Sequence, residues 1–98
     1  MKRNRPPSKS TQAVLKELLI KPQYGYALMK STGLKSGTLY PILMRLTDRG
    51  LLKSKWEPSE QQGRPPRQRY QLTAQGRRYA LEAMAKNIAL TRALGART

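Results

Sequence analysis

The sequence contains no cysteine and no histidine among its 98 residues. Without cysteine, disulfides and thiolate metal sites are excluded, and a reducing compartment is tolerated. Acidic residues number only five, and no two of them stand in a motif that would make a shared catalytic site. The Gly-x-Gly-x-x-Gly and phosphate-loop patterns are absent as well. We therefore expect a protein that is not an enzyme and that uses no metal or cofactor.

Long hydrophobic runs are also missing. No apolar run approaches the roughly 20 residues that a membrane-spanning helix needs. Residues 1–7 are basic, but no apolar stretch follows them as it would in a secretory signal. The sequence thus predicts no membrane partner and a cytoplasmic, nucleoid-associated location.

What the chain has in excess is positive charge. Twenty Lys and Arg residues against five acids give a net charge of +15. A single compact domain with this surplus repels itself unless a polyanion neutralises it. Charge alone does not show whether the partner is DNA, RNA or an anionic membrane surface. The order of the secondary-structure elements has to distinguish them.

The first half of the chain shows apolar residues at helical spacing. Residues 1–9 are basic and nearly free of apolar side chains, so we expect a disordered arm. A helix capped by Ser10 or Thr11 follows it, and this helix ends before Pro22 because the residue preceding a proline disfavours the α conformation. Two further helices, each closed by a glycine, are expected at about residues 24–32 and 36–49.

In the second half of the chain the period of the apolar residues changes from 3.6 residues, typical of a helix, to 2 residues, typical of a strand. Leu52, Ser54 and Trp56 alternate with charged residues, and Tyr70 and Leu72 later alternate with polar ones, which predicts two strands. The segment between them, residues 58–67, holds one glycine and three prolines and is expected to be a long basic loop. Thr73 is expected to cap a last helix at about residues 74–94.

The short turn at Gly33 between the second and third helices is typical of a helix-turn-helix. The second helix of such a unit lies in the major groove of DNA. We therefore predict an α+β, mostly α fold: a winged helix-turn-helix at residues 10–73, made of three helices and a two-stranded β-wing. Residues 74–98 would form a C-terminal dimerisation helix.

The candidate DNA-binding residues lie on the third helix and the wing. Ser36, Thr38 and Tyr40 would face bases or adjacent phosphates, with Gly37 and Pro41 on the same outer side. For Tyr40, packing at the helix start and contact with DNA are both open. The cations that would hold the phosphate backbone are Lys35, Arg45, Lys53, Lys55, Arg64, Arg67 and Arg69.

Aromatic residues in a small domain usually belong to the core. On this ground Tyr24, Tyr26 and Trp56 are interpreted as core residues, and stacking of Trp56 on a ligand is the alternative.

The last helix carries a second apolar side. Its 3–4 spacing predicts a seam with a twofold mate, and the alternative is a single broad face on the monomer's own core. The seam residues are Leu81, Met84, Ile88 and Thr91.

Several of these runs occur together in one family, and the chain resembles the PadR-like transcriptional regulators. The resemblance covers roughly residues 11–80. It implies that the third helix and the wing contact DNA and that the C-terminal helix pairs two subunits. The residues that carry it are Tyr24-Gly25-Tyr26, Ser36-Gly37-Thr38-Leu39-Tyr40-Pro41, Arg45-Leu46 through Arg49-Gly50-Leu51-Leu52, and Arg69-Tyr70-Gln71-Leu72-Thr73 with Gly76.

The chain departs from the family in two respects. Members often have a longer C-terminal region, sometimes implicated in sensing small aromatic ligands, whereas one helix is predicted here. The chain is also more basic than a typical member. A small-molecule effector is therefore possible but unsupported by the sequence.

Together these observations predict a transcriptional regulator, a repressor, that binds specific double-stranded DNA as a homodimer. The recognition helix at about residues 36–49 would enter the major groove, and the basic wing at about residues 58–68 would lie on the backbone or in the minor groove. The alternative is an architectural or RNA-binding basic protein without strong sequence specificity.

Overall fold

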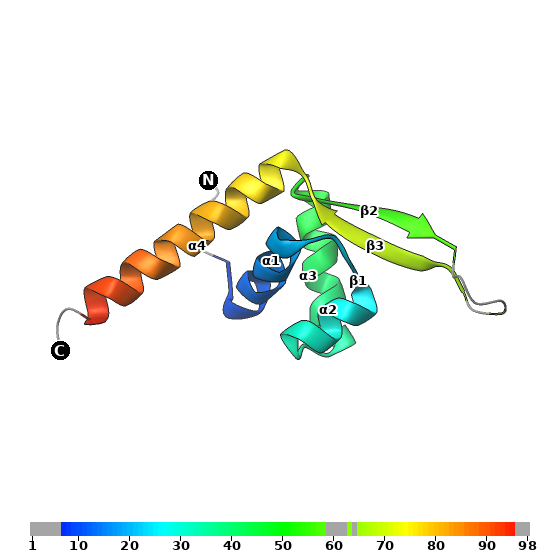
Figure 1. The fold of residues 1–98 in the computed structure, drawn as a ribbon, viewed down its shortest axis with the longest axis horizontal. Coiled ribbons are helices and arrows are strands. Elements are labelled where there is room, and N and C mark those ends of the chain that lie inside the picture. The colour runs from blue at the N-terminus through cyan, green and yellow to red at the C-terminus, as the bar shows by residue number, and fades with distance from the viewer. Residues whose placement is uncertain (1–6, 59–62, 64, 96–98) are drawn as a thin grey trace.

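The computed structural model describes residues 7–58, 63 and 65–95, with side chains up to residue 86. Within these ranges the fold is mostly helical, and a small antiparallel sheet completes a winged helix, in agreement with the predicted fold class. In Figure 1 the wing extends to one side of the helical body and the long last helix extends to the other. The elements in order are α1 (Lys9–Ile20), β1 (Gln23–Tyr24), α2 (Gly25–Thr32), α3 (Ser36–Asp48), β2 (Leu52–Glu57), β3 (Arg67–Leu72) and α4 (Ala74–Gly95).

The first helix begins earlier than the sequence suggested. Ser8, not Ser10 or Thr11, is the N-cap, and its hydroxyl accepts a hydrogen bond from the Thr11 backbone N–H at 3.2 Å. Helix α1 therefore starts at Lys9, inside the segment predicted to be a disordered arm, whereas residues 1–6 of that arm lie outside the described residues. The end of α1 is as predicted, because Lys21 is extended immediately before Pro22.

A third strand was not anticipated by the sequence analysis. The two residues of β1 pair antiparallel with β3, so the strand order is β1-β3-β2. Helix α2 consequently begins at Gly25 and ends at Gly33, whose φ of 74° is in the left-handed region that glycine tolerates best. The pairing ties the start of the helix-turn-helix to the base of the wing.

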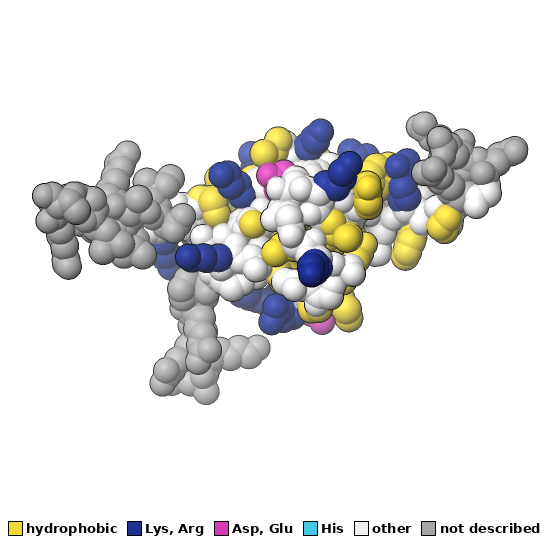
Figure 2. All heavy atoms as spheres, turned by 90° about the horizontal axis from the view of Figure 1, so that it is seen from below, with side chains coloured by type: hydrophobic (Ala, Val, Ile, Leu, Met, Phe, Trp, Pro, Cys, Tyr) yellow, Lys and Arg dark blue, Asp and Glu magenta, His cyan; other side chains and the backbone are white. Residues whose placement is uncertain are grey.

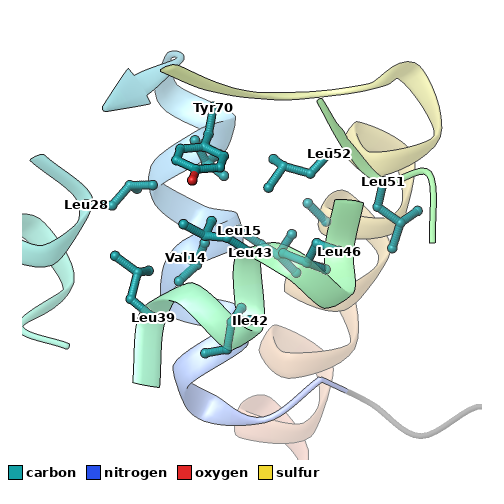
Figure 3. Packing of buried hydrophobic residues seen from close by; sticks show 12 residues of the cluster. Val14, Leu15, Leu28, Leu39, Ile42, Leu43, Leu46, Leu51, Leu52 and Tyr70 are labelled. Atoms are coloured by element: carbon teal, nitrogen blue, oxygen red, sulfur yellow. The ribbon is translucent and has the colours of Figure 1, made fainter. Parts of the chain in front are cut away.

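The core lies between α1, α3 and the sheet. Val14 and Leu15 of α1 meet Leu39 and Leu43 of α3, and all four side chains are fully or almost fully buried. Tyr70 of β3 closes this cluster from the sheet side (Figure 3). The packing fixes the rotation of α3, since the leucine side of the helix is held and the other side must face outward.

Helix α4 begins at a close contact with the end of α3. The hydroxyl of Thr73 accepts a hydrogen bond from the Gly76 N–H at 2.9 Å and donates one to the Gly50 carbonyl at 2.7 Å. A Cβ at Gly76 would lie 1.7 Å from the Leu51 carbonyl oxygen, so only glycine allows this approach. From there α4 packs along α1 and buries Ala80 completely.

Among the described residues, no helix combines the length and the apolar character that crossing a membrane requires.

Candidate nucleic-acid interface

The recognition helix α3 presents one exposed side to solvent. Its predicted contact residues Ser36, Gly37, Thr38, Pro41 and Arg45 are all exposed, as is Lys35 just before the helix. Pro41 removes the hydrogen bond that its N–H would donate to the Gly37 carbonyl, yet the helix runs without a break from Ser36. The start of α3 is therefore free to approach another molecule.

Met44 is a residue on this side that the sequence analysis missed. It lies off the leucine stripe of α3 and is 66% exposed. The only available signal was its position between the stripe residue Leu43 and the exposed Arg45. A thioether at this place suits apolar contact with a thymine methyl group in the major groove.

Tyr40 both packs and is exposed, so the two interpretations left open for it are compatible. Its side chain is 40% exposed, and its hydroxyl lies 2.6 Å from where a Cβ of Gly25 would be. The absence of a side chain at Gly25 therefore lets the tyrosine ring settle against the start of α2. This contact joins α2 to α3 at the end of the helix-turn-helix that would meet DNA.

The outer face of the wing, which points away from α3, holds a network around Glu57. Arg69 pairs with the Glu57 carboxylate at 3.6 Å, and the Tyr24 hydroxyl donates a hydrogen bond to Glu57 at 2.5 Å. The Arg67 guanidinium lies 4.3 Å from the centre of the Tyr24 ring. Of the predicted phosphate ligands, Arg67 thus also holds the wing to β1, and Arg69 holds β3 to Glu57 of β2. Lys53 and Lys55 are exposed on the same face.

This network shifts the titration of its own members. The hydrogen bond from Tyr24, followed by the charge of Arg69, lowers the pKa of Glu57 below its ordinary value of 4.5. The same hydrogen bond raises the pKa of Tyr24. At neutral pH the carboxylate is therefore ionised and keeps both partners in place.

The inner face of the wing, toward α3, is held by a polar relay. The Gln68 amide donates a hydrogen bond to the Ser54 hydroxyl at 2.7 Å, and the Tyr70 hydroxyl donates one to the Gln68 carbonyl oxygen at 3.0 Å. Burial raises the pKa of Tyr70, so this hydroxyl remains a donor. The relay fixes the side chains that face the recognition helix.

The prediction that Tyr26 and Trp56 are core residues is wrong. Tyr26 is 68% exposed and Trp56 is 65% exposed, whereas Tyr24 is half-buried. For Trp56 the reason is geometric, because the β2 residues past Leu52 are exposed as far as Trp56. Tyr26 lies on the exposed side of α2. Trp56 shares the inner face with Leu52 but lies four residues farther along the strand.

The exposed aromatics surround a cleft where the wing, the start of α2 and α3 meet. We call this cleft of about 310 Å³ the aromatic cleft. A shallow groove beside it runs between α3 and the wing and includes Met44 and Asp48. Figure 2 shows hydrophobic side chains exposed among Lys and Arg on the face seen from below. The aromatic cleft is lined by Tyr24, Gly25, Tyr26, Tyr40, Trp56, Pro66, Arg67, Gln68 and Tyr70.

Of the predicted dimer seam on α4, Leu81 is 52% exposed and Met84 is half-buried. Ala80 and Ala83, by contrast, are buried against the protein's own core. The side chains of Ile88 and Thr91 lie outside the described residues, as does Arg64 in the wing. In its described part α4 therefore has one side on the core and another on the surface.

Two of the solved structures similar to this chain are regulators of transcription. A PadR-like transcription factor from Bacteroides fragilis is 27% identical with a TM-score of 0.76, covering 90% of this chain and 88% of that one. A PadR family transcriptional regulator from Eggerthella lenta is 37% identical with a TM-score of 0.75, covering 87% and 77%.

A third structure shares the fold alone. It is the PcaV transcriptional regulator from Streptomyces coelicolor in complex with its natural ligand, 24% identical with a TM-score of 0.79, covering 96% of this chain and 64% of that one. The comparison with curated proteins gives no match.

The family model described as "Transcriptional regulator PadR-like family" matches residues 14–82, which include the helix-turn-helix, the wing and the start of α4. The chain therefore belongs to the PadR-like family of transcriptional regulators.

Proposed function

We propose that the protein is a repressor, without enzymatic activity, that binds specific double-stranded DNA as a homodimer. Helix α3 enters the major groove, and the wing lies on the adjacent backbone or in the minor groove. Two recognition helices in a twofold dimer then meet successive major grooves about one helical turn apart.

The observation that carries this proposal is the anchoring of α3. Leu39, Leu43 and Leu46 are buried, while the opposite side of the same helix is exposed along its length. The net charge of +15 supplies the attraction to phosphate, and Lys53 and Lys55 place part of it on the wing.

The primary experiment is a titration of the protein against labelled duplex DNA from the region flanking its own gene, at several salt concentrations. If the dimer neutralises about 6–10 phosphates, its affinity falls by about 10³–10⁵ between 50 and 200 mM salt. A footprint on the same fragment should show two protected half-sites. An affinity that does not respond to salt would contradict the proposal.

Competition separates this function from the architectural or RNA-binding alternative. The labelled fragment is competed with bulk DNA and with double-stranded RNA. A-form RNA has a deep, narrow major groove that does not admit α3, so RNA should compete poorly. Equal competition by all three nucleic acids would favour a non-specific polyanion binder.

Two substitutions test which residues specify sequence. Thr38→Ala on α3 should reduce the ratio of the affinity for operator DNA to the affinity for random DNA, because base contacts carry the sequence information. Lys55→Ala on the wing should weaken binding to both by similar factors. We choose Lys55 as the phosphate contact because Arg67 and Arg69 are also engaged within the protein. If both variants change specificity equally, this division of roles is wrong.

A further inference from the structure

A recognition helix in the major groove and a wing beyond it leave one sugar–phosphate strand between them, because that strand separates the major from the minor groove. In this protein the aromatic cleft lies where the wing, the start of α2 and the start of α3 meet, beside the groove that runs between α3 and the wing. We propose that the aromatic cleft binds this strand, with deoxyribose against Trp56 and Tyr26 and a phosphate at the cationic rim. The inference rests on the proposed function and assigns a DNA contact to residues outside the recognition helix and the lysines of the wing.

The first support is the exposure of the aromatic walls. Tyr26 from α2 and Trp56 from β2 come from distant parts of the sequence, yet they line the same cleft while remaining about two-thirds exposed. Large aromatic side chains gain most when they are removed from water, so two of them exposed at one cleft mark a contact surface. The inner-face relay and the Tyr40–Gly25 contact hold neighbouring walls of the cleft in place.

The second support is the charge around the cleft. None of its nine lining residues is Asp or Glu, and one of them is Arg67. The guanidinium of Arg67 lies over Tyr24 at 4.3 Å from the ring centre, and the ammonium of Lys30 lies 5.4 Å from the centre of the Tyr26 ring. Lys30 and Arg67 therefore place positive charge beside the rim, and the Glu57 carboxylate bound to the Tyr24 hydroxyl offsets part of it on the Arg67 side.

Apolar walls together with a cationic rim fit a partner that alternates apolar rings and negative charges. A DNA strand has this chemistry at each nucleotide, because a deoxyribose is followed by a phosphate. The contact also predicts a component of affinity that differs from counterion release. Burial of Trp56 changes no charge, so its contribution should not depend on salt.

Trp56 is the only tryptophan of the chain, so its fluorescence reports on the aromatic cleft alone. The full-length protein is titrated with a duplex operator fragment carrying a fluorescein label, and anisotropy and tryptophan emission are followed in parallel. We expect the tryptophan emission to change and to saturate at the same DNA concentration as the anisotropy.

The matched variants are Trp56→Ala, Trp56→Phe and Lys55→Ala. Trp56→Ala should weaken binding about tenfold, a typical effect of truncating an aromatic anchor, and by the same factor at 50 and 200 mM salt. Trp56→Phe keeps an aromatic ring and should retain most of the affinity. Lys55→Ala removes one lysine from each subunit of the dimer, so it should instead reduce the slope of log affinity against log salt by about two.

The outcomes separate the two hypotheses. If the wild-type protein does not bind the duplex, the proposed function fails. If it binds, but the emission of Trp56 is unchanged and Trp56→Ala binds as well as wild type, the cleft does not contact DNA. Tyr26→Ala repeats the test from the other wall, so a folding defect in the Trp56 variant does not leave the question open.

Discussion

At the scale of single residues, position 76 leaves no room for a side chain. We predict that Gly76→Ala is strongly destabilising, because its Cβ would lie 1.7 Å from the Leu51 carbonyl oxygen, a backbone atom that cannot rotate away. The loss should be near the upper end of the range of about 1–3 kcal/mol seen for overpacking. Urea unfolding followed by circular dichroism measures it.

Gly37 provides the matched control for this substitution. It lies in the first turn of α3 with nothing within 4 Å of the position that its Cβ would take. Gly37→Ala should therefore leave stability unchanged or raise it by up to about 1 kcal/mol, since alanine is the better helix former. Equal losses in the two variants would show that steric contact with Leu51 is not the cause.

Glu57 should make the stability of the wing depend on pH. Its pKa is lowered in the folded protein, first by the hydrogen bond from Tyr24 and then by Arg69. A carboxyl group whose pKa is lowered by folding stabilises the folded protein at pH values above its ordinary pKa of 4.5. This contribution to stability disappears as the pH falls through the folded-state pKa. The free energy of unfolding should therefore be larger for wild type than for Glu57→Gln at pH 7. The difference between the two proteins should disappear at acidic pH.

Unfolding free energies of the two proteins at pH 7 and at pH 3 test this. Glutamine keeps an oxygen that can accept from Tyr24, so the comparison isolates the charge. A gap of the same size at both pH values would mean that the carboxylate charge does not contribute.

At the scale of elements, the junction between the wing and α4 depends on one hydroxyl. Thr73 accepts from the Gly76 N–H and donates to the Gly50 carbonyl, so it caps α4 and ties it to the end of α3. We predict that Thr73→Ala costs about 1–2 kcal/mol, as for the loss of other N-caps, and that Thr73→Ser recovers most of it. Thermal unfolding of both variants gives the comparison, and an equally low melting temperature for the serine variant would contradict the cap.

Helices α1 and α3 could be predicted from the sequence because each buries an apolar stripe. The stripe of α3, from Leu39 to Leu46, spans two turns and therefore predicts which face of the helix packs against the core. Helix ends marked by Gly33 and Thr73 were also found correctly, since backbone geometry requires those residue types there. The start of α1 was missed because Ser8, Ser10 and Thr11 are all competent caps.

The third strand and the aromatic cleft could not be predicted in the same way. With two residues, β1 is too short to show any period, and its pairing with β3 is a contact between distant segments. Alternation along β2 correctly placed Leu52, Ser54 and Trp56 on one face. The alternation does not predict that α3 covers only the beginning of that face of β2, because the covered length depends on where the helix ends in the folded protein.

At the scale of the whole molecule, the wing and α4 extend from opposite sides of the helical body (Figure 1). The elements proposed to contact DNA are thus separated from the exposed side of α4. A second copy of the chain can therefore pair through α4 without blocking α3, which a twofold DNA-binding dimer requires.

We predict that Leu81→Glu disrupts this pairing. Leu81 is 52% exposed in the monomer, so a charge there is tolerated by the fold but would be buried in a twofold seam, where an unpaired carboxylate is costly. The mass from light scattering should fall from two chains to one. Because each half-site is then bound independently, operator affinity should fall by about 100-fold or more.

Gln75→Glu is the charge-matched control. It adds the same negative charge to α4 at an exposed position in the first turn, where the helix dipole favours an acid. It should remain dimeric and keep most of its affinity. If Leu81→Glu also remains dimeric, α4 is not the seam and the two recognition helices must be held together by another surface. If both variants lose affinity to the same extent while remaining dimeric, the loss of affinity reflects net charge, because the dimer would then be intact in each.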